Sequence, residues 1–187
     1  CFIGENGSTS SLSYEELRNA VAQCASGLKS LGVSKNDRVA AVIPNCPEAV
    51  IGMLATASLG AIWSSCSPDF GINGIYDRLG QISPKILITV NAYHYNGKEH
   101  DCLLKIREIV IRIPSIESVF IVPFTETIIK FKGNEQAWGK LLNSSACTVN
   151  FAQLPFDHPL YILYSSGTTG LPKSIVHGAG GTLLKHL

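Results

Sequence analysis

Short apolar runs that alternate with segments of helical periodicity constrain the fold of this chain more than any other feature. Strands are expected at 39–43, 61–65, 85–90, 118–122 and 160–164, where apolar residues are continuous. Helices are expected between them, because apolar side chains recur there at three- and four-residue intervals. Strands that alternate with helices favour an α/β fold with a mainly parallel sheet flanked by helices.

Capping residues place the ends of the first two helices. Ser13, followed three residues later by Glu16, is a capping-box pattern, and Gly32 is expected to end that helix. Pro47 is expected to begin the second helix, where its missing N–H costs nothing, and Gly60 to end it.

The later helices are less clearly bounded. Asp69 or Asn73 is expected to cap a short helix that runs through Leu79. Another helix is expected at 103–111, with proline soon after it, and a last one at 182–187, after a Gly-Gly pair.

Composition excludes several classes of protein. The chain has 187 residues, 45% of them hydrophobic and 16% charged, which is enough apolar material for one sizeable core. The formal net charge of +1 implies no strong attraction to nucleic acid or to an anionic membrane. The one membrane-like stretch, 49–63, is too short to cross a bilayer. We therefore expect no nucleic-acid partner and no membrane insertion.

Six cysteines are spread along the chain without a C-x-x-C pair or zinc-ligand spacing. We expect free thiols in a reducing compartment and no metal site made by these residues. The first residues lack the basic and apolar regions of a secretory signal. The sequence therefore predicts a cytosolic (cytoplasmic) protein.

The segment Tyr161–Lys173, YILYSSGTTGLPK, carries the most specific chemical signal. Gly167 and Gly170 permit tight turns, so that several backbone N–H groups can converge on one anion. Lys173 adds a positive charge. Four hydroxyl groups in the same loop add donors: those of Ser165, Ser166, Thr168 and Thr169. This combination indicates a site for a polyphosphate.

The loop differs from the P-loop of nucleoside triphosphatases. When Lys173 is aligned with the P-loop lysine, Pro172 stands where a glycine is required, and proline has no N–H to donate. The residues from Lys173 to His177 are typical of a strand, whereas a P-loop opens a helix. A strand, a polar loop and a second strand predict a hairpin.

The loop Tyr164–Lys173 resembles the signature loop of the adenylate-forming superfamily, which includes acyl-CoA synthetases, luciferases and peptide-synthetase adenylation domains. Four other segments, 61–71, 77–85, 95–100 and 176–181, resemble the acetoacetyl-CoA synthetases within that superfamily. The resemblance covers nearly the whole chain and is weakest over 124–150.

This resemblance implies a function. Residues 1–187 would be a partial N-terminal AMP-binding (adenylation) domain, without the C-terminal domain. The full enzyme would activate acetoacetate with ATP to an acyl-adenylate and transfer it to CoA, with Mg²⁺ assisting, releasing AMP and pyrophosphate. The superfamily has further catalytic parts downstream, so we expect a polypeptide of these residues alone to be inactive.

The resemblance also implies site residues. Lys173 would act in catalysis. Lys98 would lie near the phosphates of CoA, although a plain loop lysine is an alternative, and His177 would lie near the acyl substrate, although a structural histidine is equally ordinary. The ATP phosphates would be bound by Ser165, Ser166, Gly167, Thr168, Thr169, Gly170 and Lys173.

Two other functions stay open at this point. One is an acetyl- or propionyl-CoA synthetase-like enzyme, which would share the adenylation chemistry. The other is a truncated, non-catalytic nucleotide-binding module. Trp63 follows an apolar run and is expected in the core rather than at a cofactor.

Overall fold

A mainly parallel sheet forms the centre of the protein. The computed structural model describes residues 1–5, 7–143, 145–166 and 170–186. The strands of the sheet are β3 (Arg38–Val42), β4 (Ile62–Cys66), β5 (Ile86–Val90), β8 (Ser118–Val122), β9 (Glu135–Ala137), β10 (Pro159–Ser165) and β11 (Lys173–Gly178). Their spatial order is β11-β10-β4-β3-β5-β8-β9. All neighbouring strands run parallel except β10 and β11, which confirms the predicted fold class.

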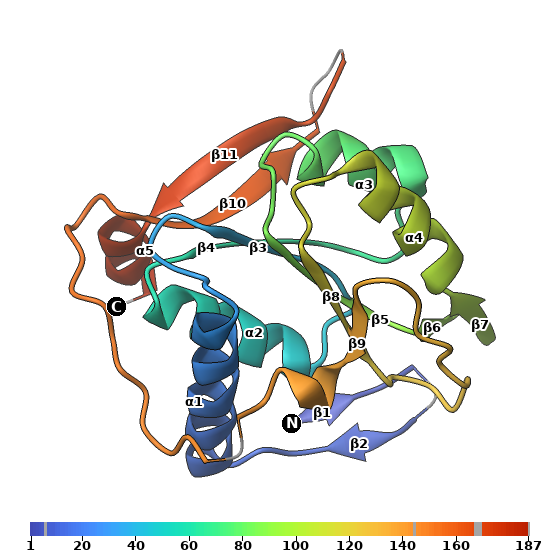
Figure 1. Cartoon of the computed structure of the whole chain (residues 1–187), viewed down its shortest axis with the longest axis horizontal. Coiled ribbons are helices and arrows are strands. Elements are labelled where there is room, and N and C mark those ends of the chain that lie inside the picture. The colour runs from blue at the N-terminus through green and yellow to red at the C-terminus, as the bar shows by residue number, and fades with distance from the viewer. Residues whose placement is uncertain (6, 144, 167–169, 187) are drawn as a thin grey trace.

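Helices cover both faces of this sheet (Figure 1). They are α1 (Tyr14–Ser30), α2 (Pro47–Ser58), α3 (Ile72–Leu79), α4 (Leu103–Arg112) and α5 (Ala179–His186), with a 3-10 turn η1 (Trp138–Lys140). The chain moves from β3 to β4 in one direction and from β4 past β3 to β5 in the other. Right-handed crossovers in opposite directions place α2 on one face and α3 and α4 on the other. None of the helices within the described ranges is long and apolar enough to cross a membrane.

The central strands are continuous apolar runs because both of their faces are buried. Every residue of β5 is buried, as are four of the five in β3 and in β8. Trp63 of β4 is 4% exposed, and its ring packs against Gly52 of α2, which confirms that it is a core residue.

Most helix ends lie where the capping residues of the sequence predict them. The capping box at the start of α1 is present: Ser13 Oγ accepts from the backbone N–H of Glu16, whose carboxylate accepts from the N–H of Ser13 at 2.7 Å. Pro47 is the first residue of α2. Both ends match the sequence-based predictions because they depend on neighbours in the chain.

Two helix starts differ from the predictions. The residue preceding α3 is Gly71, whose lack of a side chain leaves no cap. The carboxylate of Asp69 accepts from Ser67 Oγ at 2.8 Å instead, and Asn73 accepts from Arg112. The last helix begins at Ala179 and so includes the two glycines. Of these contacts, the one between Asn73 and Arg112 joins distant parts of the chain and is not visible in the local pattern.

Two small hairpins lie outside the main sheet. Strands β1 (Phe2–Ile3) and β2 (Thr9–Ser10) pair near the N-terminus. Strands β6 (Ala92–Tyr95) and β7 (Lys98–Asp101) are joined by Asn96 and Gly97, whose φ angles are 49° and 72°. Positive φ at both turn residues is the geometry that Asn-Gly favours in two-residue hairpins. These strands were not predicted from the sequence, although the Asn-Gly pair is a signal for such a hairpin.

Candidate functional site

Strands β10 and β11 form the hairpin predicted around the polar loop. They pair antiparallel, with Ser165 opposite Lys173 and Tyr164 opposite Ser174. Lys173 therefore begins a strand and not a helix, so the P-loop interpretation is wrong for this chain. Gly170 has a φ of +95°, a conformation open to glycine at little cost. Ser166 is exposed, and the remaining predicted loop residues, Gly167, Thr168 and Thr169, lie outside the described residues.

Side-chain alternation gives this hairpin two chemically different faces. Lys173 and His177 lie on one face, because residues two and four apart in a strand point the same way. Ser165 shares that face through its pairing with Lys173. Tyr164 and Ser174 lie on the opposite face. The positive charge of the loop and the anchoring contacts of the hairpin are thus on different sides of the sheet.

The anchoring face contacts strand β4. The hydroxyl of Ser64 donates to the carbonyl of Ile162 at 2.9 Å and lies 3.1 Å from the hydroxyl of Tyr164. Burial raises the pKa of Tyr164 to about 12, so this phenol stays neutral at physiological pH. Ser64 is itself fully buried. These contacts fix the strand that leads into the loop, and neither residue was singled out from the sequence.

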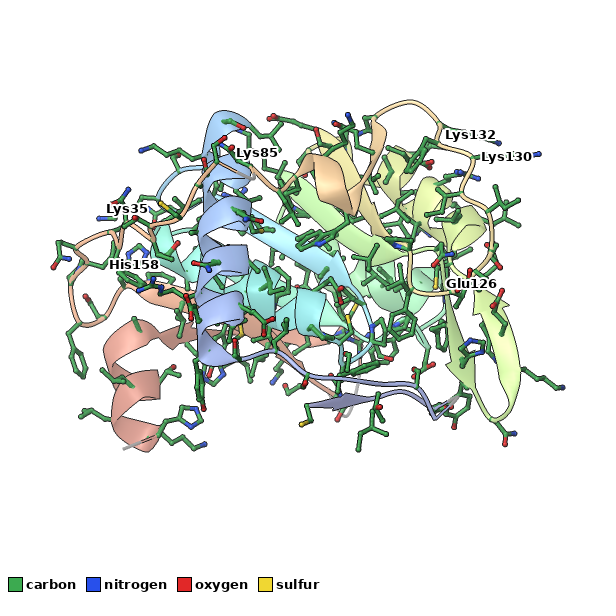
Figure 2. All side chains as sticks on the ribbon, turned by 90° about the horizontal axis from the view of Figure 1, so that it is seen from below. Lys35, Lys85, Glu126, Lys130, Lys132 and His158 are labelled. Atoms are coloured by element: carbon green, nitrogen blue, oxygen red, sulfur yellow. The ribbon has the colours of Figure 1, made fainter. Side chains whose placement is uncertain are left out.

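The other end of the hairpin is fixed by a histidine just before β10. The ring of His158, labelled in Figure 2, is 5% exposed, and its Nε2 atom lies 2.9 Å from the carbonyl oxygen of Gly60. The backbone carbonyl of His158 accepts from the N–H of Ala179 at 2.8 Å. His158 therefore ties together the base of the hairpin, the end of α2 and the start of α5.

His177 lies at this base rather than at the loop. Its ring packs on Tyr161, its partner across the hairpin, with ring centroids 5.1 Å apart. Four residues of extended strand separate it from Lys173, which is about 13 Å. The two predicted site residues share a face of the hairpin but are not brought together.

The polar loop lies at the edge of the sheet where the parallel strands end. Because β10 is parallel to β4, Ser165 lies at the same edge as Cys66, the last residue of β4. Ligands of open α/β sheets bind outside the carboxyl ends of the strands, where neighbouring connections leave in opposite directions. In this sheet that point lies between β3 and β5.

A cleft of about 610 Å³ lies at that point. Its walls include Ile43 after β3, Cys66 of β4, Tyr93 just after β5 and Val122 of β8. The hydroxyl of Tyr93 interacts with the carboxylate of Asp69, which also lines the cleft. Burial, followed by this contact, raises the pKa of Tyr93 to about 12. The cleft is large enough for part of a cofactor-sized molecule.

Lys98 is exposed and lies next to the cleft, not in its wall. It pairs with Tyr95 across the β6–β7 turn, and Tyr95 lines the cleft. The turn of Asn96 and Gly97 therefore holds the lysine at the cleft's rim, where a long flexible side chain can reach an anion.

Among residues 1–5, 7–143, 145–166 and 170–186, no three His, Cys, Asp or Glu side chains gather in a way that could hold a metal ion.

Comparisons with known proteins place this geometry in a family context. A model described as AMP-binding enzyme matches residues 1–185. The chain is 49% identical to acetoacetyl-CoA synthetase of Gallus gallus, and 47% identical to acetoacetyl-coenzyme A synthetase of Rhizobium meliloti (strain 1021). It is 42% identical to malonamoyl-CoA synthetase vrtB of Penicillium aethiopicum.

These matches cover 94%, 100% and 98% of the chain, but only 28%, 29% and 27% of the relatives. A solved structure of acetoacetyl-CoA synthetase from Streptomyces lividans superimposes with a TM-score of 0.92 at 41% identity, over 98% of this chain and 28% of that one. The chain thus spans just over a quarter of the length of the relatives it matches.

Proposed function

This chain belongs to the family of AMP-binding enzymes, and from that premise we propose that it is part of an acid–thiol ligase that activates acetoacetate with ATP and transfers the acyl group to CoA. Residues 1–187 would contribute part of the adenylation domain. The observation that carries this function is the hairpin, because it holds Lys173 beside a loop rich in hydroxyls and glycines at the ligand-binding edge of the sheet. The free thiols of all six cysteines support a cytosolic location.

The first chemical step would activate the carboxylate. A carboxylate is a poor acyl donor because its leaving group would be oxide. A carboxylate oxygen therefore attacks the α-phosphorus of ATP, the bond from that phosphorus to the bridging oxygen breaks, and pyrophosphate leaves. Lys173 and the hydroxyls of Ser165 and Ser166 would stabilise the negative charge on the triphosphate, together with Gly167, Thr168, Thr169 and Gly170.

The second step would form the thioester. The sulfur of CoA attacks the acyl carbon, the carbon–oxygen bond to AMP breaks, AMP leaves and the thiol proton is released. The cleft at the carboxyl ends of β3, β4, β5 and β8 could accommodate a portion of CoA. Lys98 at its rim would then serve as a point charge for a CoA phosphate.

Mg²⁺ is included in the proposed function only because the chain resembles this family. It would neutralise charge on the triphosphate when bound. The described residues offer no ligand cluster for it, so we route no step through the ion.

The acid substrate is proposed to be a short one with a carbonyl group β to the carboxylate. The similar synthetases named above act on acetoacetate or form malonamoyl-CoA, and both acyl groups carry such a carbonyl. Acetate and propionate lack it, which disfavours an acetyl- or propionyl-CoA synthetase. His177 could donate a hydrogen bond to this carbonyl only if the substrate extended toward the base of the hairpin.

Acid-dependent exchange between ATP and radiolabelled pyrophosphate tests this function in the full-length protein. Exchange that requires acetoacetate would demonstrate adenylate formation without needing the CoA step. A protein that binds ATP but shows no exchange with any of the acids tested would be a non-catalytic nucleotide-binding module, and the proposed function would be wrong.

A further inference from the structure

The side chain of Gln81 forms hydrogen bonds to residues far away in the sequence, although Gln81 lies on the surface. It lies two residues after Leu79, the last residue of α3, and is exposed. Its side-chain amide nevertheless contacts two residues more than 90 positions away: Nε2 donates to the carbonyl of Pro172 at 2.9 Å, and Oε1 accepts from Ser174 Oγ at 3.0 Å. The same Nε2 also donates to the carbonyl of Asp77 at 2.5 Å.

These contacts join α3 to the polar loop. The carbonyl of Asp77 is one of those left without a helical partner at the end of α3, and Gln81 satisfies it. The other two contacts are to the residues on either side of Lys173. Figure 1 shows the end of α3 beside the part of the hairpin that is furthest from α5.

Gln81 approaches the face of β11 opposite to that of Lys173. Ser174 points to the face of β11 opposite to Lys173, because neighbouring strand residues alternate. Gln81 therefore holds the C-terminal stem of the loop from behind. Ser64 and Tyr164 hold the N-terminal stem from the same side. With both stems fixed, the start of β11 is held in place at Lys173.

We propose that Gln81 is a positioning residue for the phosphate-binding loop, and that its contacts with Pro172 and Ser174 preorganise Lys173 for ATP. This role rests on the proposed function. A primary amide suits it because the group donates and accepts at once. Without the amide, the stem moves more freely, and ATP binding must then supply the cost of ordering it.

The test is a set of kinetic measurements on the full-length protein. Gln81→Ala is expected to raise the KM for ATP about three- to tenfold, as the loss of one or two neutral hydrogen bonds predicts, and to leave the KM for acetoacetate unchanged. Ser174→Ala should do the same, whereas Ser174→Thr keeps the hydroxyl and should restore the KM. The double variant Gln81→Ala/Ser174→Ala should be little worse than either single one.

A matched control is Gln153→Ala, because Gln153 is also exposed, and within the described part of the chain its side chain hydrogen-bonds only to Phe151, two residues away. It should change neither KM. If Gln81→Ala does not fold, Ser174→Ala serves alone, since it replaces an exposed strand residue. Equal shifts in the KM values for ATP and acetoacetate, or no shift in either, would contradict the positioning role.

Lys173→Ala, measured in parallel, separates this role from the proposed function. The proposed function fails if the unaltered protein shows no acetoacetate-dependent pyrophosphate exchange. If exchange is present and Lys173→Ala leaves it unchanged, Lys173 does not act on the phosphates and the positioning role is wrong, while the proposed function stands. If Lys173→Ala impairs exchange while Gln81→Ala leaves the KM for ATP unchanged, only the positioning role is wrong.

Discussion

Lys173 is the residue on which the proposed chemistry depends most. It begins β11, faces away from the anchoring contacts of Ser64 and Gln81, and lies opposite Ser165 at the stem of the loop. A lysine here provides a mobile point charge, which suits a triphosphate whose charge moves from the α- to the leaving β-phosphate during the reaction.

Lys173→Ala should therefore slow acetoacetate-dependent pyrophosphate exchange. Loss of a hydrogen bond to a charged group costs about 1.5–3 kcal/mol, which is a reduction of roughly ten- to a hundredfold in kcat/KM. Lys132→Ala is the matched control, because Lys132 lies just before β9 at the other end of the sheet order (Figure 2). An equal loss in both variants would point to a general effect of charge and not to a phosphate contact.

The cysteines divide into exposed and buried groups. Cys1 and Cys147 are exposed. Burial raises the thiol pKa from 9.0 to about 12 at Cys24, Cys46 and Cys66, and to about 11 at Cys102. A buried neutral thiol is a poor nucleophile, because the thiolate is the reactive form.

A colorimetric thiol titration of a protein made of these 187 residues should therefore detect two fast thiols in the native state and six after unfolding. Stability should also depend on pH. Because the folded pKa values are raised, the four buried thiols stabilise the fold fully below pH 9, and that contribution is lost as the pH rises from 9 towards 12. Six fast thiols in the native protein would show that the core described above is not formed.

At the scale of whole elements, α5 shows how a tertiary contact overrides a local signal. Two glycines near its start suggested a helix that begins after them. Gly180 lies inside the helix, and its backbone is close to the ring of Phe156. A Cβ atom at this position would lie 2.2 Å from Phe156 Cδ2 and 2.5 Å from Cγ. The N–H of Gly180 also donates to the carbonyl of Phe156 at 2.8 Å. Gly181 has open space around it.

Alanine substitutions at these two glycines should have opposite effects. Gly180→Ala forces the ring and the helix apart, and overpacking of this kind costs about 1–3 kcal/mol. Gly181→Ala meets nothing and should stabilise the helix by up to about 1 kcal/mol. Urea unfolding of both variants measures the difference. Two stabilised variants would mean that α5 does not pack on Phe156.

The same distinction between local and distant causes explains which features were predictable. Strands such as β5 and β8 were placed correctly because burial on both faces makes them continuous apolar runs. The loop before Lys173 was recognised because its donors are consecutive in the sequence. Gln81 and Ser64 could not be recognised, because their partners lie 91 to 100 residues away. The β6–β7 hairpin was missed although its Asn-Gly turn is local.

At the scale of the whole molecule, two candidate binding regions lie along one edge of the sheet. The polar loop follows β10 at one end of that edge, and the cleft lies at the carboxyl ends of β3, β4, β5 and β8. In the proposed function, a triphosphate would bind at the loop and part of CoA in the cleft.

Substrate preference is the property of the whole protein that most directly tests its place among the acyl-CoA synthetases. We expect kcat/KM to be highest for acetoacetate, with malonamate next, and much lower for acetate, butyrate and palmitate. The β-carbonyl oxygen of the first two acids can accept a hydrogen bond, and a donor placed for it would be left unpaired by acetate or butyrate, a mismatch that discriminates strongly. Palmitate would be excluded by volume.

Butyrate is the sharpest control, because it has the chain length of acetoacetate without the carbonyl. Measurements on a single preparation of the full-length protein with all five acids would decide the matter. Equal use of butyrate would show that length, and not the carbonyl, sets the preference. Better use of acetate would assign the protein to the acetyl-CoA synthetases and leave the adenylation chemistry of the hairpin intact.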